Sequence, residues 1–202
     1  KINVEPFSIL LEPLGRNTAP AITLAAFRAI KEEMDPLLLI LSADHKIENN
    51  SKFISSIVQG LTFANQGRIV TFGVKTTSPE TGFGYIETFD QISKNCDVSK
   101  IKRFIEKPTK EKASQFFEDS HFLWNSGIFL FKASTILNEI KKYQFQIYER
   151  CKKSIDKSNK DFYFERIDNH NFQKCPNISI DMAIMEKTNL GTVVSLDAGW
   201  DD

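Results

Sequence analysis

Polar residues collect at the points where several apolar segments of the chain end. The first of these segments is followed by residues 12–21, EPLGRNTAPA, which combine a carboxylate, a guanidinium, an amide and a hydroxyl. A helix start needs only a turn and a capping side chain, which Asn17 or Thr18 supplies, with Pro20 in the first turn. The remaining polar groups exceed what a cap requires, so this loop is a candidate ligand site.

A carboxylate also follows the second apolar segment. Asp44 comes soon after LLLIL, residues 37–41, and it is interpreted either as a cap for local backbone or as a ligand for Mg²⁺. A hard cation that is bound to a substrate phosphate needs only one or two protein carboxylates. The neighbouring His45 is interpreted as structural. Because ligands bind beyond the carboxyl ends of strands in open α/β sheets, this position suits a phosphate site.

Three further motifs place polar groups or glycine beside apolar runs, namely TGFGY (81–85), EKP (106–108) and WNSGI (124–128). The glycines around Phe83 form either a tight turn or a close approach of backbone to a ligand. Glu106 and Lys107 are either a surface charge pair or a pair that binds sugar hydroxyls and a phosphate. Asn125 must be hydrogen-bonded if it is buried, either to backbone or to a ligand hydroxyl.

Apolar periodicity predicts the elements that position these groups. Strands at residues 7–11, 37–41 and 68–74 alternate with helices at 18–34 and 50–66. This β-α-β-α-β order indicates an α/β protein with a parallel sheet and right-handed crossovers. The later elements are paired strands at 82–88 and 98–104, helices at 109–119, 134–143, 145–155 and 179–187, and strands at 129–131 and 191–196. No structure is predicted for residues 157–174.

Composition narrows the class of protein. The 202 residues are 41% hydrophobic and 26% charged, which is ordinary for a globular domain, and the 17 phenylalanines are interpreted as core. Lysine plus arginine and aspartate plus glutamate number 26 each, so no net field favours nucleic acid or a membrane. The three cysteines are widely spaced, which favours reduced thiols and a cytoplasmic location. No apolar run approaches the roughly 18–20 residues of a membrane span, and no signal peptide is recognised.

Taken in order, the motifs resemble one family. They are EPLGRNTAPA, LILSADHKI, PETGFGYIE, FIEKP, LWNSGIFLF, SIDMAIMEK and the terminal DAGWDD. The chain resembles bacterial mannose-1-phosphate guanylyltransferases of the sugar nucleotidyltransferase superfamily over nearly all of its length. The EP-x-GRNTAPA motif is specific to this family, whereas EKP and NSGIF occur across the wider superfamily.

The resemblance implies a reaction, a fold and a cofactor. Mannose 1-phosphate and GTP would give GDP-mannose and pyrophosphate, with Mg²⁺ as the cofactor. The implied fold is a Rossmann-like, mainly parallel sheet flanked by helices, with a smaller mixed-strand lobe that binds the sugar. The nucleophile is an already ionised phosphate oxygen, so catalysis needs alignment and charge neutralisation and requires no general base.

The resemblance also assigns residues, by position in the motifs. Asp44 and Asp202 would hold Mg²⁺, although Asp201 stands beside Asp202 where the family has serine or asparagine. Lys107 would contact the sugar phosphate. The sugar would be lined by Gly84 and Tyr85 and hydrogen-bonded by Glu106 and Asn125.

The base-recognition loop is expected within EPLGRNTAPA. Guanine presents two adjacent donors, which suit the Glu12 carboxylate or backbone carbonyls. Gly15 would let backbone approach the ring, and Arg16 and Asn17 would bind base or ribose or brace the loop. The chain also differs from the family motifs at Ser42 and Phe83, and both differences are expected to be compatible with the function of the site.

The family's N-terminal strand and Gly-rich phosphate loop have no counterpart between Lys1 and Asp202. Because that loop binds the triphosphate, residues 1–202 are expected to be a partial nucleotidyltransferase domain, without the N-terminal loop and the C-terminal region, and inactive alone.

Two alternatives stay open, and homo-oligomerisation is compatible with either. One is a nucleotidyltransferase for another pair, such as UTP or dTTP with glucose 1-phosphate. The other is a non-catalytic module that binds a nucleotide or a sugar. A glycosyltransferase is disfavoured because Asp44-His45-Lys46 is not the expected DxD motif.

Overall fold

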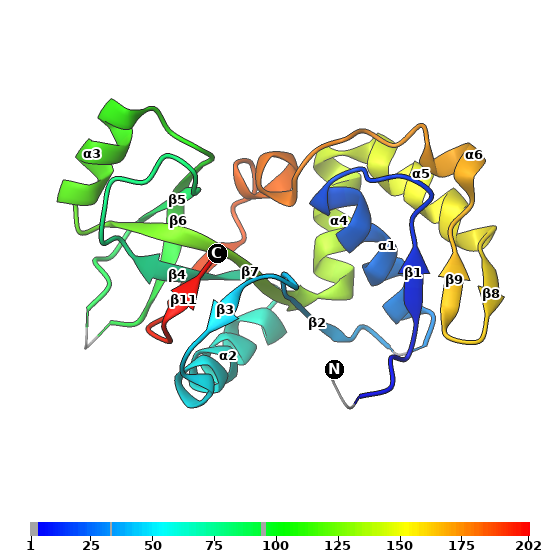
Figure 1. The fold of residues 1–202 in the computed structure, drawn as a ribbon, viewed down its shortest axis with the longest axis horizontal. Helices are drawn as coiled ribbons and strands as arrows, with labels where there is room; N and C mark the ends of the chain where they lie inside the picture. Colours follow the sequence, from blue (N-terminus) through cyan, green and yellow to red (C-terminus); the bar gives the residue numbers. More distant parts are fainter. Residues whose placement is uncertain (1–3, 33, 94–95) are drawn as a thin grey trace.

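The computed structural model describes residues 4–32, 34–93 and 96–202. Its largest sheet is built from strands that are far apart in the sequence (Figure 1). These strands are β2 (Leu37–Ile40), β4 (Ile69–Lys75), β5 (Tyr85–Thr88), β6 (Val98–Ile105), β7 (Phe122–Lys132) and β10 (Gly191–Ser195). In space they follow the order β2-β7-β4-β10-β6-β5. A further pairing of β5 with β7 closes all of them except β2 into a small five-stranded barrel.

This sheet is mixed, so the prediction of a mainly parallel, Rossmann-like sheet is wrong. β4 and β10 pair in parallel, whereas β7 runs antiparallel to β2, β4 and β5. The sequence pattern predicted that β2 and β4 would belong to one parallel unit. Instead β7 lies between them, because its 11 residues are mostly buried and are long enough to pair along several neighbours.

Helices cover two sides of this sheet (Figure 1). α1 (Thr18–Ile30), α4 (Ala133–Tyr143) and α5 (Phe145–Asp156) pack against one another on one side. α2 (Asn50–Asn65) packs against β4, β7 and β10 elsewhere, and α3 (Lys110–Glu118) covers the barrel through Phe116. Most predicted helices therefore exist, although α1 ends at residue 30 and not at residue 34.

A second sheet lies beyond α1 and contains β1 (Ile9–Leu11), β9 (Phe164–Arg166) and β8 (Asn159–Asp161). β1 pairs with β9 in parallel, and β8 and β9 form an antiparallel hairpin. The short helix α6 (Asn169–Phe172) follows. The sequence predicted no structure for this segment, because β9 is held by its pairing with a strand more than 150 residues earlier and shows no clear local period.

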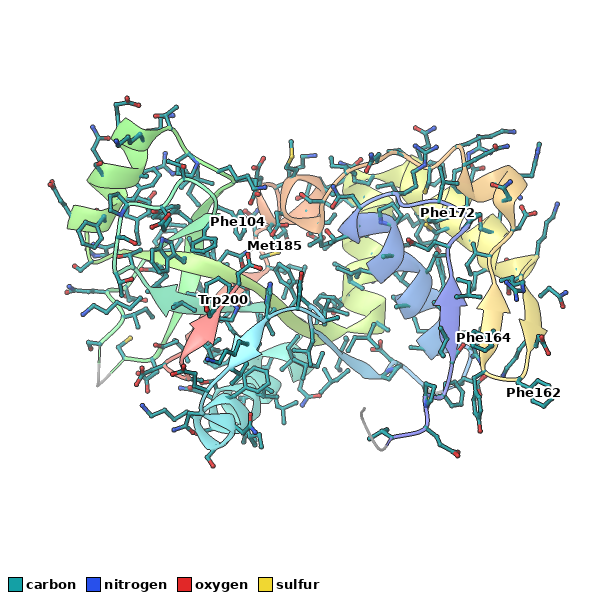
Figure 2. The ribbon with its side chains drawn as sticks, viewed as in Figure 1. Phe104, Phe162, Phe164, Phe172, Met185 and Trp200 are labelled. Atoms are coloured by element: carbon teal, nitrogen blue, oxygen red, sulfur yellow. The ribbon has the colours of Figure 1, made fainter. Side chains whose placement is uncertain are left out.

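The phenylalanines are only partly core residues. Phe72, Phe129, Phe131 and Phe172 are at most 2% exposed, as expected from the composition. The β8–β9 hairpin, however, exposes Phe162 and Phe164 on the surface, and Phe162 is 87% exposed (Figure 2).

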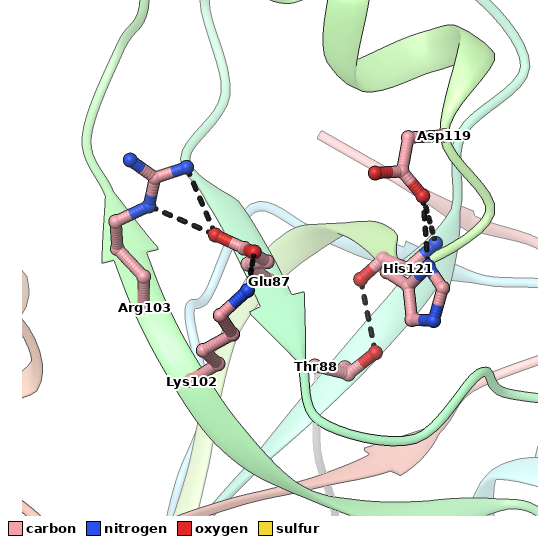
Figure 3. Close-up of polar contacts among 6 residues, drawn as sticks. All are labelled: Glu87, Thr88, Lys102, Arg103, Asp119 and His121. Carbon is pink, nitrogen blue, oxygen red and sulfur yellow. Dashed lines mark hydrogen bonds and ion pairs between the residues drawn. The ribbon is translucent and has the colours of Figure 1, made fainter.

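A carboxylate joins two neighbouring strands of the barrel (Figure 3). Glu87 on β5 accepts hydrogen bonds from Lys102 at 2.7 Å and from Arg103 at 2.9 Å, both on β6. Burial alone would raise the pKa of Glu87, but the bonds and charges of these two cations outweigh it and lower the pKa. Next to it, the Thr88 hydroxyl donates to the backbone carbonyl of His121. The arrangement fixes the β5–β6 pairing.

Within the described residues, no helix combines the length and the apolar character that a membrane crossing requires.

Candidate functional site

A cavity of about 460 Å³ lies between the barrel and the start of α1. Five residues that the sequence singled out contribute to its wall, namely Gly84, Glu106, Lys107, Asn125 and Asp202. Gly84 directly precedes β5, Glu106 and Lys107 directly follow β6, Asn125 lies in β7 and Asp202 follows β11 (Trp200–Asp201), so the fold brings together groups that are distant in sequence.

His45 and Asp202 in the cavity wall belong to a cluster of acidic and imidazole groups that also includes Asp44. β3 (Lys46–Ile47) and β11 (Trp200–Asp201) pair antiparallel, with Trp200 opposite Ile47. This pairing places ligand atoms of Asp44, His45 and Asp202 within 4.8 Å of one another. Asp201 is not part of that group, so the geometry favours the register in which the last carboxylate faces Asp44.

The donor set fits Mg²⁺. Two carboxylates supply the oxygen ligands that this cation prefers. His45 is already bonded on both ring nitrogens, because Trp200 Nε1 donates to Nδ1 at 3.2 Å and Nε2 lies 3.1 Å from Asp202 Oδ1. With Nδ1 as the acceptor, Nε2 carries the hydrogen and donates to the carboxylate. His45 therefore orients Asp202, in the way that outer-shell partners hold metal ligands.

A β-bulge aims Asn125 into the cavity. The register between β4 and β7 shifts between Thr71 and Gly73, opposite the residues that follow Asn125. Such bulges re-aim side chains and are frequent next to active sites. Both the side chain and the backbone of Asn125 are fixed. Its side-chain Oδ1 accepts a hydrogen bond from Thr71 Oγ1 at 3.0 Å, and its backbone N–H donates to the Gly84 carbonyl at 2.8 Å.

Glu106 and Lys107 lie directly after β6. A Cβ on Gly84 would lie 2.8 Å from Glu106 Oε2, so glycine at this position leaves the space that the carboxylate occupies. Burial, and next the charge of Asp181, raise the pKa of Glu106. Lys107 has a φ of +45°, a strained conformation for a residue with a side chain, and such strain collects at functional sites.

Asp181 belongs to this site and was not assigned a role from the sequence. It begins a π-helical turn, η1 (Asp181–Met185), which lies between the barrel and the helices in Figure 1 and is a type of turn often found at functional sites. Its Oδ1 accepts from Asn125 Nδ2 at 3.1 Å, and the residue lines the cavity. Only its position inside SIDMAIMEK pointed to it.

The residues assigned to base recognition, namely Glu12, Gly15, Arg16 and Asn17, lie next to this cavity and do not line it. Thr18 and Ala21 border the cavity, whereas Glu12 faces a second cavity of about 320 Å³ that Ala21 also borders. Burial raises the pKa of Glu12, and its Oε1 has no hydrogen-bond partner among the described residues.

The other loop residues are placed as follows. Arg16 donates from Nη2 to the carbonyl of Gln173, which braces the loop against the segment after α6. Asn17 caps α1 through its Oδ1 while its backbone has φ 66° and ψ −175°, a region that is otherwise nearly confined to glycine. Gly15 has open space around its missing Cβ.

Tyr85 does not reach the cavity with its side chain. It is fully buried, its ring packs at an angle of 52° to the Phe116 ring, and its hydroxyl donates to the Glu80 carbonyl at 2.8 Å. Its role as a sugar-lining residue stays a prediction that the geometry of this side chain does not favour.

Comparison with known proteins identifies the family. The Nucleotidyl transferase family matches residues 2–202. The chain belongs to that family. It is 44% identical over 197 residues to the mannose-1-phosphate guanylyltransferase RfbM of Salmonella typhimurium, covering 96% of this chain and 41% of the relative. It is 43% identical over 200 residues to the alginate biosynthesis protein AlgA of Pseudomonas aeruginosa, covering 99% and 42%.

Solved structures agree with these relatives. A Helicobacter pylori structure described as mannose-6-phosphate isomerase has a TM-score of 0.86 and 33% identity, covering 96% of this chain and 74% of that chain. A Thermus thermophilus structure described as mannose-1-phosphate geranyltransferase has a TM-score of 0.81 and 29% identity, covering 95% and 53%. The nucleotidyl transferase chain described here spans about two fifths of the length of the curated relatives that it matches.

Proposed function

We propose that the full-length protein transfers GMP from GTP to mannose 1-phosphate and releases pyrophosphate. The observation that carries this proposal is one cavity whose wall contains Glu106 and Asn125, which suit sugar hydroxyls, together with Lys107 and Asp202, which suit phosphates and their cation. Ligand atoms of Asp44, His45 and Asp202 lie within 4.8 Å of one another, so Asp44 stands beside this wall. Relatives with 44% identity that are named mannose-1-phosphate guanylyltransferase support the choice of substrates.

The reaction is an in-line displacement at the α-phosphate of GTP. A phosphate oxygen of mannose 1-phosphate forms the new bond to phosphorus, and the bond to the bridging oxygen of the leaving pyrophosphate breaks. The attacking oxygen is already ionised, so no side chain has to remove a proton. Lys107, whose side chain is 66% exposed at the cavity wall, neutralises the sugar phosphate as a point charge.

Mg²⁺ supplies charge neutralisation on the phosphates when it is bound, and we propose that Asp44 and Asp202 hold it. His45 keeps the Asp202 carboxylate turned toward Asp44 through its Nε2–H. Glu106 and Asn125 orient the sugar, and Gly84 leaves room for Glu106.

The nucleotide base is assigned to the loop of residues 12–17. Glu12 offers an unpaired carboxylate oxygen that suits the two adjacent donors of guanine. Gly15 leaves open space for a ring to approach, and the glycine-like backbone of Asn17 holds the loop in an unusual conformation. Arg16 either contacts the nucleotide or braces the loop through Gln173.

Full activity is proposed to need chain outside residues 1–202. Among the described strands, β1 pairs with β9 alone and β2 pairs with β7 alone, so each has one edge without a partner. A further strand that carries a Gly-rich phosphate loop would pair with these edges and bind the triphosphate. The 202-residue chain expressed alone is therefore expected to be inactive or nearly so.

Measurement of pyrophosphate release tests the assignment. The full-length protein is incubated with each of GTP, UTP, dTTP and ATP and with mannose 1-phosphate or glucose 1-phosphate, with and without Mg²⁺. We expect GTP with mannose 1-phosphate and Mg²⁺ to be the fastest combination. A strong preference for UTP or dTTP would overturn the GTP assignment, and ligand binding without any turnover would favour the non-catalytic module.

A further inference from the structure

Asp181 is the most enclosed carboxylate at the cavity, and it is held there from two sides. Asn125 Nδ2 donates to its Oδ1 at 3.1 Å. The preceding residue is fixed to the start of α1, because the Ile180 N–H donates to Thr18 Oγ1 at 2.8 Å. Asp181 therefore has a defined position between the barrel and the nucleotide loop.

An ionised carboxylate is unfavourable at this position. Burial is the largest cause that raises the pKa of Asp181, and the charge of Glu186 adds to it, while a hydrogen bond from its own backbone N–H, the bond from Asn125 and the charge of Lys107 oppose the shift. A carboxylate has about four lone-pair sites, so these two hydrogen bonds still leave acceptor capacity for a ligand. A buried acceptor of this kind is stabilised when a ligand donates a hydrogen bond to it.

The neighbouring charges indicate what kind of ligand donates. The charge of Asp181 acts on Glu106, so this wall of the cavity holds two carboxylates and would repel a phosphate. Neutral hydroxyl groups match it, since each donates one hydrogen bond to a carboxylate oxygen. The phosphate is left to Lys107 and to the cation held by Asp44 and Asp202.

We propose that Asp181 is a specificity-determining residue that accepts a hydrogen bond from one hydroxyl of the sugar ring. This inference rests on the proposed function and extends it, because Asp181 and Glu106 would then form hydrogen bonds to two different hydroxyls of the same sugar ring. A sugar phosphate that lacks the hydroxyl facing Asp181 leaves a buried carboxylate unsatisfied and is bound more weakly.

The first test is Asp181→Asn in the full-length protein. The substitution keeps the volume and retains an acceptor for Asn125, but it replaces a carboxylate oxygen with an amide donor. We expect kcat/KM for mannose 1-phosphate to fall about 10- to 100-fold, through KM, with the KM for GTP unchanged. The matched control is Asp161→Asn, an exposed aspartate at the end of β8 that does not line the cavity, which should keep wild-type values.

Folding of the variant is checked separately. Because the pKa of Asp181 is raised, its ionised form destabilises the folded protein as the pH rises above the ordinary value of an aspartate. Asp181→Asn should thus melt at the same temperature as the wild type or higher at pH 8. A lower kcat/KM without a lower melting temperature would show that the substitution impairs substrate binding and not folding.

The decisive test uses mannose 1-phosphates that lack one ring hydroxyl each, with wild type and Asp181→Asn. One deoxy substrate should already be poor for the wild type and should suffer little further loss in the variant, since both changes remove the same bond. An equal loss for every substrate, or no loss with mannose 1-phosphate, would overturn the proposal. If the wild type prefers another sugar phosphate, the GDP-mannose assignment fails, and the deoxy series of that sugar then tests Asp181.

Discussion

The proposed site has two ends, the proposed sugar end and the proposed nucleotide end, and they differ in how many of their polar groups have hydrogen-bond partners. At the sugar end, Asn125 is bonded to Thr71 and Asp181, and Glu106 occupies space left by Gly84. At the nucleotide end, Glu12 Oε1 and Arg16 Nε are buried without a hydrogen-bond partner in the described part of the chain. The first end is preorganised, whereas the second requires a ligand or additional chain to complete it.

The strands show the same difference. The sugar end is built on a closed barrel, in which β5 and β7 complete the ring. The nucleotide end is built on β1 and β2, and each of these has a free edge among the described strands. Closure of the barrel allows the sugar end to hold its geometry independently of any other segment.

Removal of the metal carboxylate should have the largest effect, because both ends depend on it. Asp202→Asn in the full-length enzyme is expected to lower kcat about 100-fold or more, with only small changes in either KM. Pyrophosphate release across a Mg²⁺ titration measures it. Asp201→Asn is the control, and an equal loss in that variant would show that the register of the last residues is different.

A change confined to the preorganised end should have the next largest effect. Gly84→Ala places a Cβ 2.8 Å from Glu106 Oε2 and displaces that carboxylate. We expect the KM for mannose 1-phosphate to rise about 10-fold and the KM for GTP to stay the same. Equal KM changes for both substrates would mean that the two ends are not independent.

A change confined to the unsatisfied end should alter selectivity more than rate. Glu12→Gln replaces a carboxylate with an amide, which is expected to shift the preference away from GTP by about 10-fold while the sugar phosphate KM is retained. Competition between GTP and UTP with the same acceptor measures this shift. Unchanged nucleotide selectivity would show that backbone groups of the loop, and not the Glu12 side chain, recognise the base.

The smallest expected effect is on stability, and its sign differs between a satisfied and an unsatisfied carboxylate. The pKa of Glu87 is lowered, so its stabilisation is present above its unfolded value and is lost as the pH falls through the folded value. The pKa of Glu12 is raised, so its ionisation destabilises the fold as the pH rises. Melting temperatures are measured from pH 4 to pH 8. As the pH approaches neutrality, Glu87→Gln should melt increasingly below the wild type, whereas Glu12→Gln should melt increasingly above it. Parallel curves for the two variants would contradict this difference.

The sequence indicated residues that share one cavity, but it did not indicate the arrangement of the sheet. Glu106 and Asn125 were singled out because each follows or interrupts an apolar segment, whereas Asp202 was assigned only by its position in the DAGWDD motif. Asp181 had no such mark, since its importance arises from a bond to Asn125 that only the tertiary fold creates.

The errors in the sheet have one physical origin. Apolar periodicity identifies a strand but carries no information about its direction or its neighbours. β7 was recognised only at residues 129–131, so its antiparallel position between β2 and β4 was not foreseen. β9 was missed for the same reason, because its partner β1 lies near the other end of the chain.

The position of the metal cluster in the sequence has a consequence for assembly. Asp44 lies in the first quarter of the chain and Asp202 is its last residue, and the two meet through strands of two residues each. A cation that binds both carboxylates would therefore close a loop that contains most of the domain, and its binding free energy would add to the stability of the whole fold. During synthesis, such a site cannot form until residue 202 has left the ribosome, so the site is completed long after Asp44 has been made.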